Sequence, residues 1–258
     1  MLREVLAALT TPASRYARRL GYVHEGIAIE ARYRRCYTDW APHIGRCHRA
    51  IQAATEKCTV HNRVVVLGSG PLYDIPLASL AGAFSQVVLL DVFHPPRARR
   101  LLARWPNVSA LEHDLLGLDV GGVDAADRAA GCLGGWRKKV PVADLVISAN
   151  LLSQLPLIPL SARVASRFRR RECEAGAWSR AIMQAHLDDL AAGPGSPCLI
   201  SEWRRRWFDR NGNEIDSELP LSGLMLPAPS DCWSWTVAPP GELSGGASLV
   251  VDVGLYSL

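Results

Sequence analysis

Arg63-Val-Val-Val-Leu-Gly-Ser-Gly-Pro-Leu-Tyr-Asp74 is the stretch of sequence that decides the fold. Its first part, through Leu67, is a short apolar run without alternation, typical of a strand covered on both faces of a parallel sheet. Gly68 and Gly70 then end the run. A glycine permits a positive φ, and its missing Cβ lets another molecule approach the backbone. The stretch therefore predicts a buried strand followed by a turn that can hold a ligand.

A helix and a second strand follow this turn. Apolar residues recur at helical spacing from Leu77 to Ala81, and Gln86-Val-Val-Leu-Leu-Asp91 is the next strand-like run. Asp91 stands about twenty residues beyond the glycines, the spacing at which a carboxylate accepts both ribose hydroxyls of a nucleoside. The glycines alone are equally compatible with an ordinary strand-to-helix turn. The strand before them and the acid after them favour a nucleoside site.

Four motifs, in order and spacing, resemble those of class I S-adenosylmethionine (SAM)-dependent methyltransferases. They are Leu67-Gly-Ser-Gly-Pro-Leu72, Leu90-Asp-Val92, His113-Asp-Leu115 and Asp144-Leu-Val-Ile-Ser-Ala-Asn-Leu-Leu152, within residues 60–210. The resemblance implies an α/β fold with a Rossmann-like sheet, and SAM as the cofactor. One departure stands out: the loop of the family usually carries a further glycine, and residues 71–73 here are Pro, Leu and Tyr.

The resemblance also implies a set of cofactor-binding residues: Gly68, Ser69, Gly70, Leu72, Asp91, Val92, Asp114, Leu115 and Asn150. Asp114 matches the acid that accepts from the adenine amino group, and a turn or helix cap is the alternative interpretation. Asn150 follows the fourth strand, so we expect it at the strand-end edge that carries Gly68 and Asp91. It lacks the Pro-Pro-aromatic continuation of enzymes that methylate the amino groups of nucleic-acid bases, which argues against nucleic acid as the acceptor.

The segment before the first strand is predicted to be a helical cap, residues 1–58, over the cofactor edge. Apolar residues at steps of three and four indicate two helices, at about 24–38 and 41–57, meeting at Pro42. Such a segment commonly forms a substrate lid in the resembled family, so His24 and Glu25 are candidate catalytic residues that take a proton from the acceptor. The alternatives are a surface histidine and an acid that complements the helix dipole.

Residues 59–258 are predicted to form the SAM-binding domain. A third strand is expected at 107–111, a fourth at 143–149, a helix at 161–192 and a fifth strand at 198–203. A β-hairpin at about 203–219, turning at Asn211-Gly212, is expected to be an insertion beside the active site. Two final strands, 232–237 and 248–256, have no helix between them. They predict an antiparallel pair that ends a mostly parallel sheet.

Composition narrows the class of protein. The chain has 258 residues, 48% of them hydrophobic, which is ample for a sizeable core. Seven cysteines without paired spacing argue against a disulfide framework or a zinc site, so we expect a cytoplasmic protein that needs no metal. No segment has the pattern of a membrane span.

The sequence therefore predicts a methyltransferase that acts on a small molecule. An anionic acceptor would suit the arginines at 163, 167 and 169–171, although such a run is usually a solvated face. Two alternatives stay open: a catalytically inactive SAM-fold binding or scaffold protein, and a nicotinamide-dependent oxidoreductase. The sequence does not determine the oligomeric state.

Overall fold

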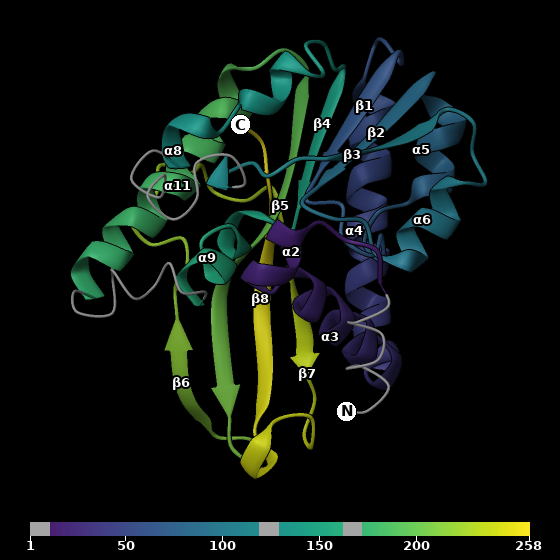
Figure 1. The fold of residues 1–258 in the computed structure, drawn as a ribbon. Coiled ribbons are helices and arrows are strands. Elements are labelled where there is room, and N and C mark those ends of the chain that lie inside the picture. Colours follow the sequence, from purple (N-terminus) through teal and green to yellow (C-terminus); the bar gives the residue numbers. More distant parts are fainter. Residues whose placement is uncertain (1–10, 119–128, 162–171) are drawn as a thin grey trace.

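An eight-stranded sheet forms the centre of the molecule (Figure 1). The computed structural model describes residues 11–118, 129–161 and 172–258. Strand order is β3-β2-β1-β4-β5-β8-β7, with β6 paired to β5 off this path. The first five strands are parallel to one another, whereas β6, β7 and β8 pair antiparallel with their neighbours. The strands are β1 Arg63–Leu67, β2 Gln86–Asp91, β3 Val108–Glu112, β4 Leu145–Ala149, β5 Ser196–Phe208, β6 Glu214–Glu218, β7 Asp231–Ala238 and β8 Ser248–Tyr256.

Helices cover both faces of the parallel part of this sheet. They are α2 Arg15–Leu20, α3 Tyr22–Arg35, α4 Tyr37–Lys57, α5 Leu77–Ala83, α6 Pro96–Leu102, α8 Ala129–Cys132, α9 Leu157–Ser161 and α11 Glu172–Ala192, with short 3-10 turns at Gly135–Lys138, Leu152–Gln154 and Ser244–Gly246. One core cluster joins α2 and α11 to one face, and a second joins α4, α5 and α6 to the other. The central strands carry continuous apolar runs because both of their faces are buried.

The predicted fold class is confirmed: the sheet is Rossmann-like, mostly parallel with an antiparallel C-terminal pair. β7 and β8 form that pair, with Asp231 opposite Leu255. The predicted hairpin turn is present too, since the N–H of Gly212 donates to the carbonyl of Asp209 at 3.1 Å. That the hairpin is an insertion beside the active site stays a prediction. Its first strand continues β5, which runs without a break from Ser196 to Phe208.

The prediction for the N-terminal helices is wrong in one respect: they meet at Cys36, and Pro42 lies inside α4. Trp40 anchors the start of α4, because its Nε1 donates to the carbonyl of Val237 at 3.0 Å and its ring lies edge-on to Trp235. This tertiary contact outweighs the single backbone hydrogen bond that a proline removes.

The predicted cap of residues 1–58 has two parts with different positions. α4 belongs to the core, because Cys47 and Ile51 are fully buried in the cluster that contains Val64 and Val66. Only α2 and α3 lie at the carboxyl ends of the strands, where Gly26 faces Phe93 in the loop after β2. In the described parts of the chain, no helix is long and apolar enough to cross a membrane.

Candidate nucleoside site at the strand ends

The turn after β1 has the backbone conformation that its glycines permit. Gly68 has φ 64° and Gly70 has φ 50°. The N–H of Gly68 donates to the carbonyl of Leu90 at 2.8 Å, so the turn is joined to the end of β2. A Cβ on Gly68 would lie 2.6 Å from Leu151 Cδ1, whereas a Cβ on Gly70 would meet only the Gly68 carbonyl, at 4.0 Å. Leu151 therefore packs against the Gly68 backbone, and among the described residues no side chain comes within 4 Å of a Cβ placed on Gly70.

Leu72 stands where the resembled family has its further glycine, and it keeps the glycine conformation. Its φ is 63°, which is rare for a residue with a side chain. The side chain turns into the core on the α4 face and is 3% exposed. Burial of the leucine offsets a backbone cost of roughly 1–2 kcal/mol. The loop therefore has its left-handed turn without the third glycine, and Leu72 presents no side chain to the strand-end edge.

Asp91 joins the end of β2 to the turn after β1. Its Oδ2 accepts from the N–H of Gly70 at 2.7 Å, and its Oδ1 accepts from its own neighbour Val92 at 2.7 Å. Burial raises the pKa of this carboxyl, and the Gly70 N–H and the nearby His94 oppose the rise. The backbone N–H of Phe93 also donates to this carboxylate, which keeps acceptor capacity for a further donor.

Ser69 and His94 lie behind the turn. The Ser69 side chain is 2% exposed, and its hydroxyl is 3.5 Å from Nδ1 of His94. Burial lowers the pKa of His94, against the attraction of Asp91. A neutral imidazole at this point supports the turn and the acid without adding a positive charge.

Asp114 caps the turn that follows β3. Oδ1 accepts from the N–H of Leu116 at 3.0 Å, and Oδ2 accepts from the N–H of Leu118 at 2.8 Å and from the Tyr16 hydroxyl at 2.5 Å. These three donors favour the turn-cap interpretation that the sequence left open, and a contact of Asp114 with adenine stays a prediction. The neighbouring Leu115 is 5% exposed and packs in the core cluster of the α11 face.

Asn150 has a left-handed backbone, with φ 53°, directly after β4. Its Nδ2 donates to Oδ2 of Asp74 at 2.6 Å, so the residue after β4 is joined to the end of the glycine loop. Burial raises the pKa of Asp74. Asp74 was part of the motif but received no role from the sequence. The signal that could have found it is topological: β1 and β4 are neighbours, so the residues that follow them meet at one edge.

A buried polar chain continues from Asn150 to the α4 face. His43 Nε2 lies 3.1 Å from the Asn150 amide, and His43 Nδ1 accepts from the indole Nε1 of Trp233 at 3.0 Å. Burial lowers the pKa of His43 to about 3, so its ring is neutral. The indole is only a donor, which places the ring proton on Nε2, where it can be donated to Cys47 Sγ at 3.4 Å. The Asn150 Nδ2 group is also a donor, so its 3.1 Å approach to Nε2 is a contact and not a hydrogen bond.

The two predicted catalytic residues do not lie among these buried polar side chains. His24 and Glu25 are both exposed on α3. The residue of α3 that reaches the acids is Tyr22, which is half-buried near Asp91 and Asp114. Tyr16 was missed, because nothing local to it indicates a partner 98 residues away. The arginines at 163, 167 and 169–171 lie outside the described residues.

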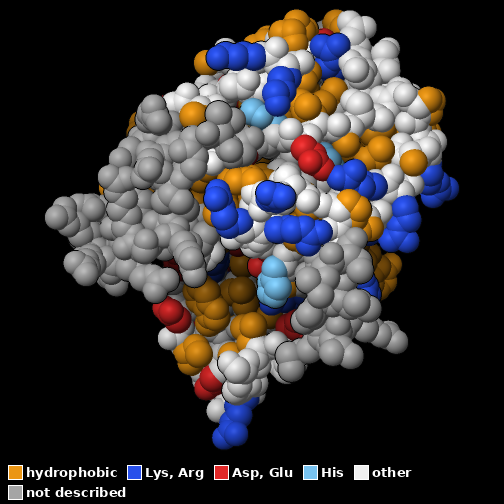
Figure 2. Space-filling model, in the orientation of Figure 1, with side chains coloured by type: hydrophobic (Ala, Val, Ile, Leu, Met, Phe, Trp, Pro, Cys, Tyr) orange, Lys and Arg blue, Asp and Glu red, His pale blue; other side chains and the backbone are white. Residues whose placement is uncertain are grey.

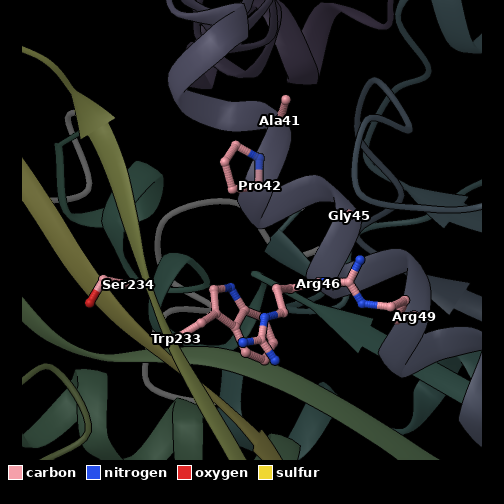
Figure 3. Close-up of a pocket in the computed structure, with 7 residues that line it drawn as sticks. All are labelled: Ala41, Pro42, Gly45, Arg46, Arg49, Trp233 and Ser234. Carbon is pink, nitrogen blue, oxygen red and sulfur yellow. The ribbon is translucent and has the colours of Figure 1, made fainter.

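Two cavities lie away from this edge. One, of about 340 Å³, opens between α4 and β7 and is lined by Arg46, Arg49 and Trp233 (Figure 3). Arg46 also pairs with Asp231 at 3.3 Å. The other, of about 430 Å³, lies at the amino ends of β2 and β3.

No protein-family model and no curated protein matches the chain. Among solved structures, similar ones include the N-methyltransferase NodS from Bradyrhizobium japonicum with S-adenosyl-L-homocysteine (SAH), with TM-score 0.38, 12% identity, and 82% of this chain and 86% of that chain covered. The DhpI–SAH complex has TM-score 0.38 and 15% identity, with 91% and 94% covered. A Burkholderia thailandensis 1,6-didemethyltoxoflavin-N1-methyltransferase with bound 1,6-didemethyltoxoflavin and SAH has TM-score 0.37 and 14% identity, with 91% and 90% covered.

Proposed function

We propose that this protein is a SAM-dependent methyltransferase that acts on a small molecule. The observation that carries the proposal is the pairing of Gly70 with Asp91. A glycine with no side chain of the described residues beside it is held by the acid at the end of the adjacent strand. In open α/β sheets, ligands bind in this crevice beyond the carboxyl ends of the strands.

The residues at this edge fit SAM. The backbone of Gly70 leaves room beside the turn among the described residues, and Asp91 can accept from ribose hydroxyls while it keeps its bond to Gly70. Asn150 and Asp74 lie between the ends of β1 and β4 and supply further polar groups. The described residues bring together no three His, Cys, Asp or Glu side chains that could hold a metal ion.

SAM, when bound, supplies a methyl group on a sulfonium, which a nucleophile can displace in line. The contribution of the protein is then alignment of the two partners and exclusion of water. Leu72 and the Asp91–Gly70 hydrogen bond fix the turn, and Asp74 fixes the side chain of Asn150. Proton removal is needed only for a protonated acceptor. His24 and Glu25 remain the proposed candidates for that step.

The acceptor is proposed to bind in front of the antiparallel part of the sheet. Figure 2 shows a hollow on this face of the molecule, with hydrophobic side chains on its visible floor and acidic side chains along its border. An apolar floor with a few polar groups is typical of a small-molecule site. The cytoplasmic setting is likewise a proposal.

Calorimetric titration with SAH, and with NADH in parallel, tests the cofactor. We expect SAH to bind and NADH not to bind. Mass spectrometry of nucleosides that copurify with the protein gives an independent readout. Binding of NADH in place of SAH would sink the proposal, and binding of SAH without turnover on a broad panel of acceptors would favour a binding or scaffold role.

A further inference from the structure

Two tyrosines of the α2–α3 segment lie against the acids of the candidate nucleoside site. The hydroxyl of Tyr16 donates to Oδ2 of Asp114 at 2.5 Å, which is short for a hydrogen bond of this kind. The ring centroids of Tyr16 and Tyr22 are 6.3 Å apart. A phenol hydroxyl therefore already occupies one acceptor position of the strand-end acids.

Tyr22 lies beside Tyr16. Its pKa is raised, first by burial and then by the negative charges of Asp114 and Asp91, and a hydrogen bond with Tyr16 acts in the opposite direction. The phenol is thus near both acids at once. These are the two carboxylates that the sequence assigns to the nucleoside.

The rest of α3 is fitted to the same loops. Gly26 faces Phe93 so closely that a Cβ would lie 2.8 Å from the ring. At the other end of the helix, Tyr33 stacks on Tyr73 of the glycine loop with centroids 3.6 Å apart, and the guanidinium of Arg97 lies 4.3 Å from the Tyr73 ring. The α2–α3 segment is therefore seated on the loop after β2 and on the loop after β1.

We propose that the α2–α3 segment closes the nucleoside site with its own tyrosines, and that a nucleoside binds by displacing the Tyr16 hydroxyl from Asp114. The inference rests on the proposed function, because it takes Asp91 and Asp114 as the nucleoside acids. A phenol hydroxyl and the amino or hydroxyl groups of a nucleoside are all hydrogen-bond donors, so one can replace the other at Asp114 while the backbone N–H groups of Leu116 and Leu118 keep their bonds to it. The measured affinity for a nucleoside then includes the free energy of opening the segment.

Tyr16→Phe tests the displacement, since it removes one hydroxyl and keeps the ring. We expect SAH to bind about five- to tenfold more tightly to this variant and to associate faster, because the closed state loses a hydrogen bond to a carboxylate. Tyr22→Leu should likewise bind SAH more tightly than the wild type. Tyr37→Phe is the matched control, because Tyr37 is 57% exposed on α4, and it should bind SAH as the wild type does.

Hydrogen exchange of the protein without ligand gives a second readout that does not depend on SAM. Exchange over residues 15–35 should rise in Tyr16→Phe and stay unchanged in Tyr37→Phe. Weaker SAH binding to folded Tyr16→Phe and Tyr22→Leu would make the tyrosines ligand contacts and overturn the proposal, and so would unchanged affinity together with unchanged exchange. If neither the wild type nor any variant binds SAH, the proposed function and the displacement both fail. Increased hydrogen exchange in Tyr16→Phe would, in that case too, show that the Tyr16 hydroxyl holds the α2–α3 segment closed.

Discussion

Asp91 accepts a hydrogen bond of 2.7 Å from the backbone N–H of Gly70, which ties the end of β2 to the turn after β1. An acid at the exposed end of a strand would be expected to contribute nothing to the folded state. This bond shows otherwise, since the carboxylate also fixes the conformation of the turn.

Asp91→Ala should weaken SAH binding by about thirty-fold to nearly a thousand-fold, which corresponds to roughly 2–4 kcal/mol for two lost charge-assisted bonds. The unfolding temperature of the ligand-free protein should also fall, because Gly70 loses its acceptor. Asp91→Asn keeps one acceptor oxygen, so its SAH affinity and its unfolding temperature should both fall less than those of Asp91→Ala. Calorimetry with SAH and a thermal melt measure the two effects. Unchanged affinity in a folded Asp91→Ala protein would remove the cofactor assignment.

Gly68→Ala and Gly70→Ala form a matched pair. Both place a Cβ on a backbone with positive φ, at a cost of roughly 1–2 kcal/mol. Only Gly68→Ala also collides with Leu151, so its stability should fall further. Gly70→Ala should unfold closer to the wild type and yet bind SAH at least about tenfold more weakly, because its methyl group enters the space beside the turn. Denaturant unfolding and SAH titration of the two proteins check this. Equal stability losses would mean that Gly68 is not packed as described.

Leu72 allows a test of the strained loop. Leu72→Ala keeps the positive φ and loses the buried side chain, so it should be destabilised by about 2–4 kcal/mol. Leu72→Gly loses the same side chain but relieves the strain, and should be about 0.5–1 kcal/mol more stable than Leu72→Ala. Glycine is normally the worse replacement, so the order of the two variants is diagnostic. Urea unfolding measures it, and an alanine variant that is the more stable would show that Leu72 carries no backbone strain.

Acid should destabilise the protein through its buried histidines. Burial lowers the pKa of His43 to about 3 and that of His186 to about 4, from an ordinary value of 6.5. Below pH 6.5 the unfolded chain therefore binds protons that the folded chain does not, and the free energy of unfolding falls as the pH falls. Each histidine contributes up to about 1.4 kcal/mol per pH unit.

The control is His186→Asn, because His186 lies 2.9 Å from the Ser148 hydroxyl and an amide can keep that contact. Urea unfolding between pH 7 and pH 5.5 should show a shallower slope for this variant than for the wild type. An identical slope would show that His186 is protonated in the folded protein.

The strands and the glycine turn could be predicted from the sequence because their signals are local. Continuous apolar runs marked β1 and β2, and the spacing from Gly70 to Asp91 marked the edge where they end. The helix boundary at Cys36 could not be predicted, because Trp40 is anchored by Val237, far along the chain.

The candidate site divides in the same way. The position of Gly70 and Asp91 at one edge of the sheet follows from the motif and its spacing, whereas the hydrogen bond between them was not predicted. The contacts of Asn150 with Asp74 and of Tyr16 with Asp114 depend on which loops the topology brings together. Without the strand order, neither Asp74 nor Tyr16 can be distinguished from an ordinary loop or surface residue.

The position of β8 has a consequence for how the chain is made. β8 lies between β5 and β7 and pairs with both, although it follows them in sequence. During synthesis, the edge of β5 that pairs with β8 therefore stays unpaired until residues 248–256 have left the ribosome. An unpaired strand edge invites association with other chains. The nascent chain should accordingly depend on chaperones most strongly in the interval between completion of β5 and arrival of β8.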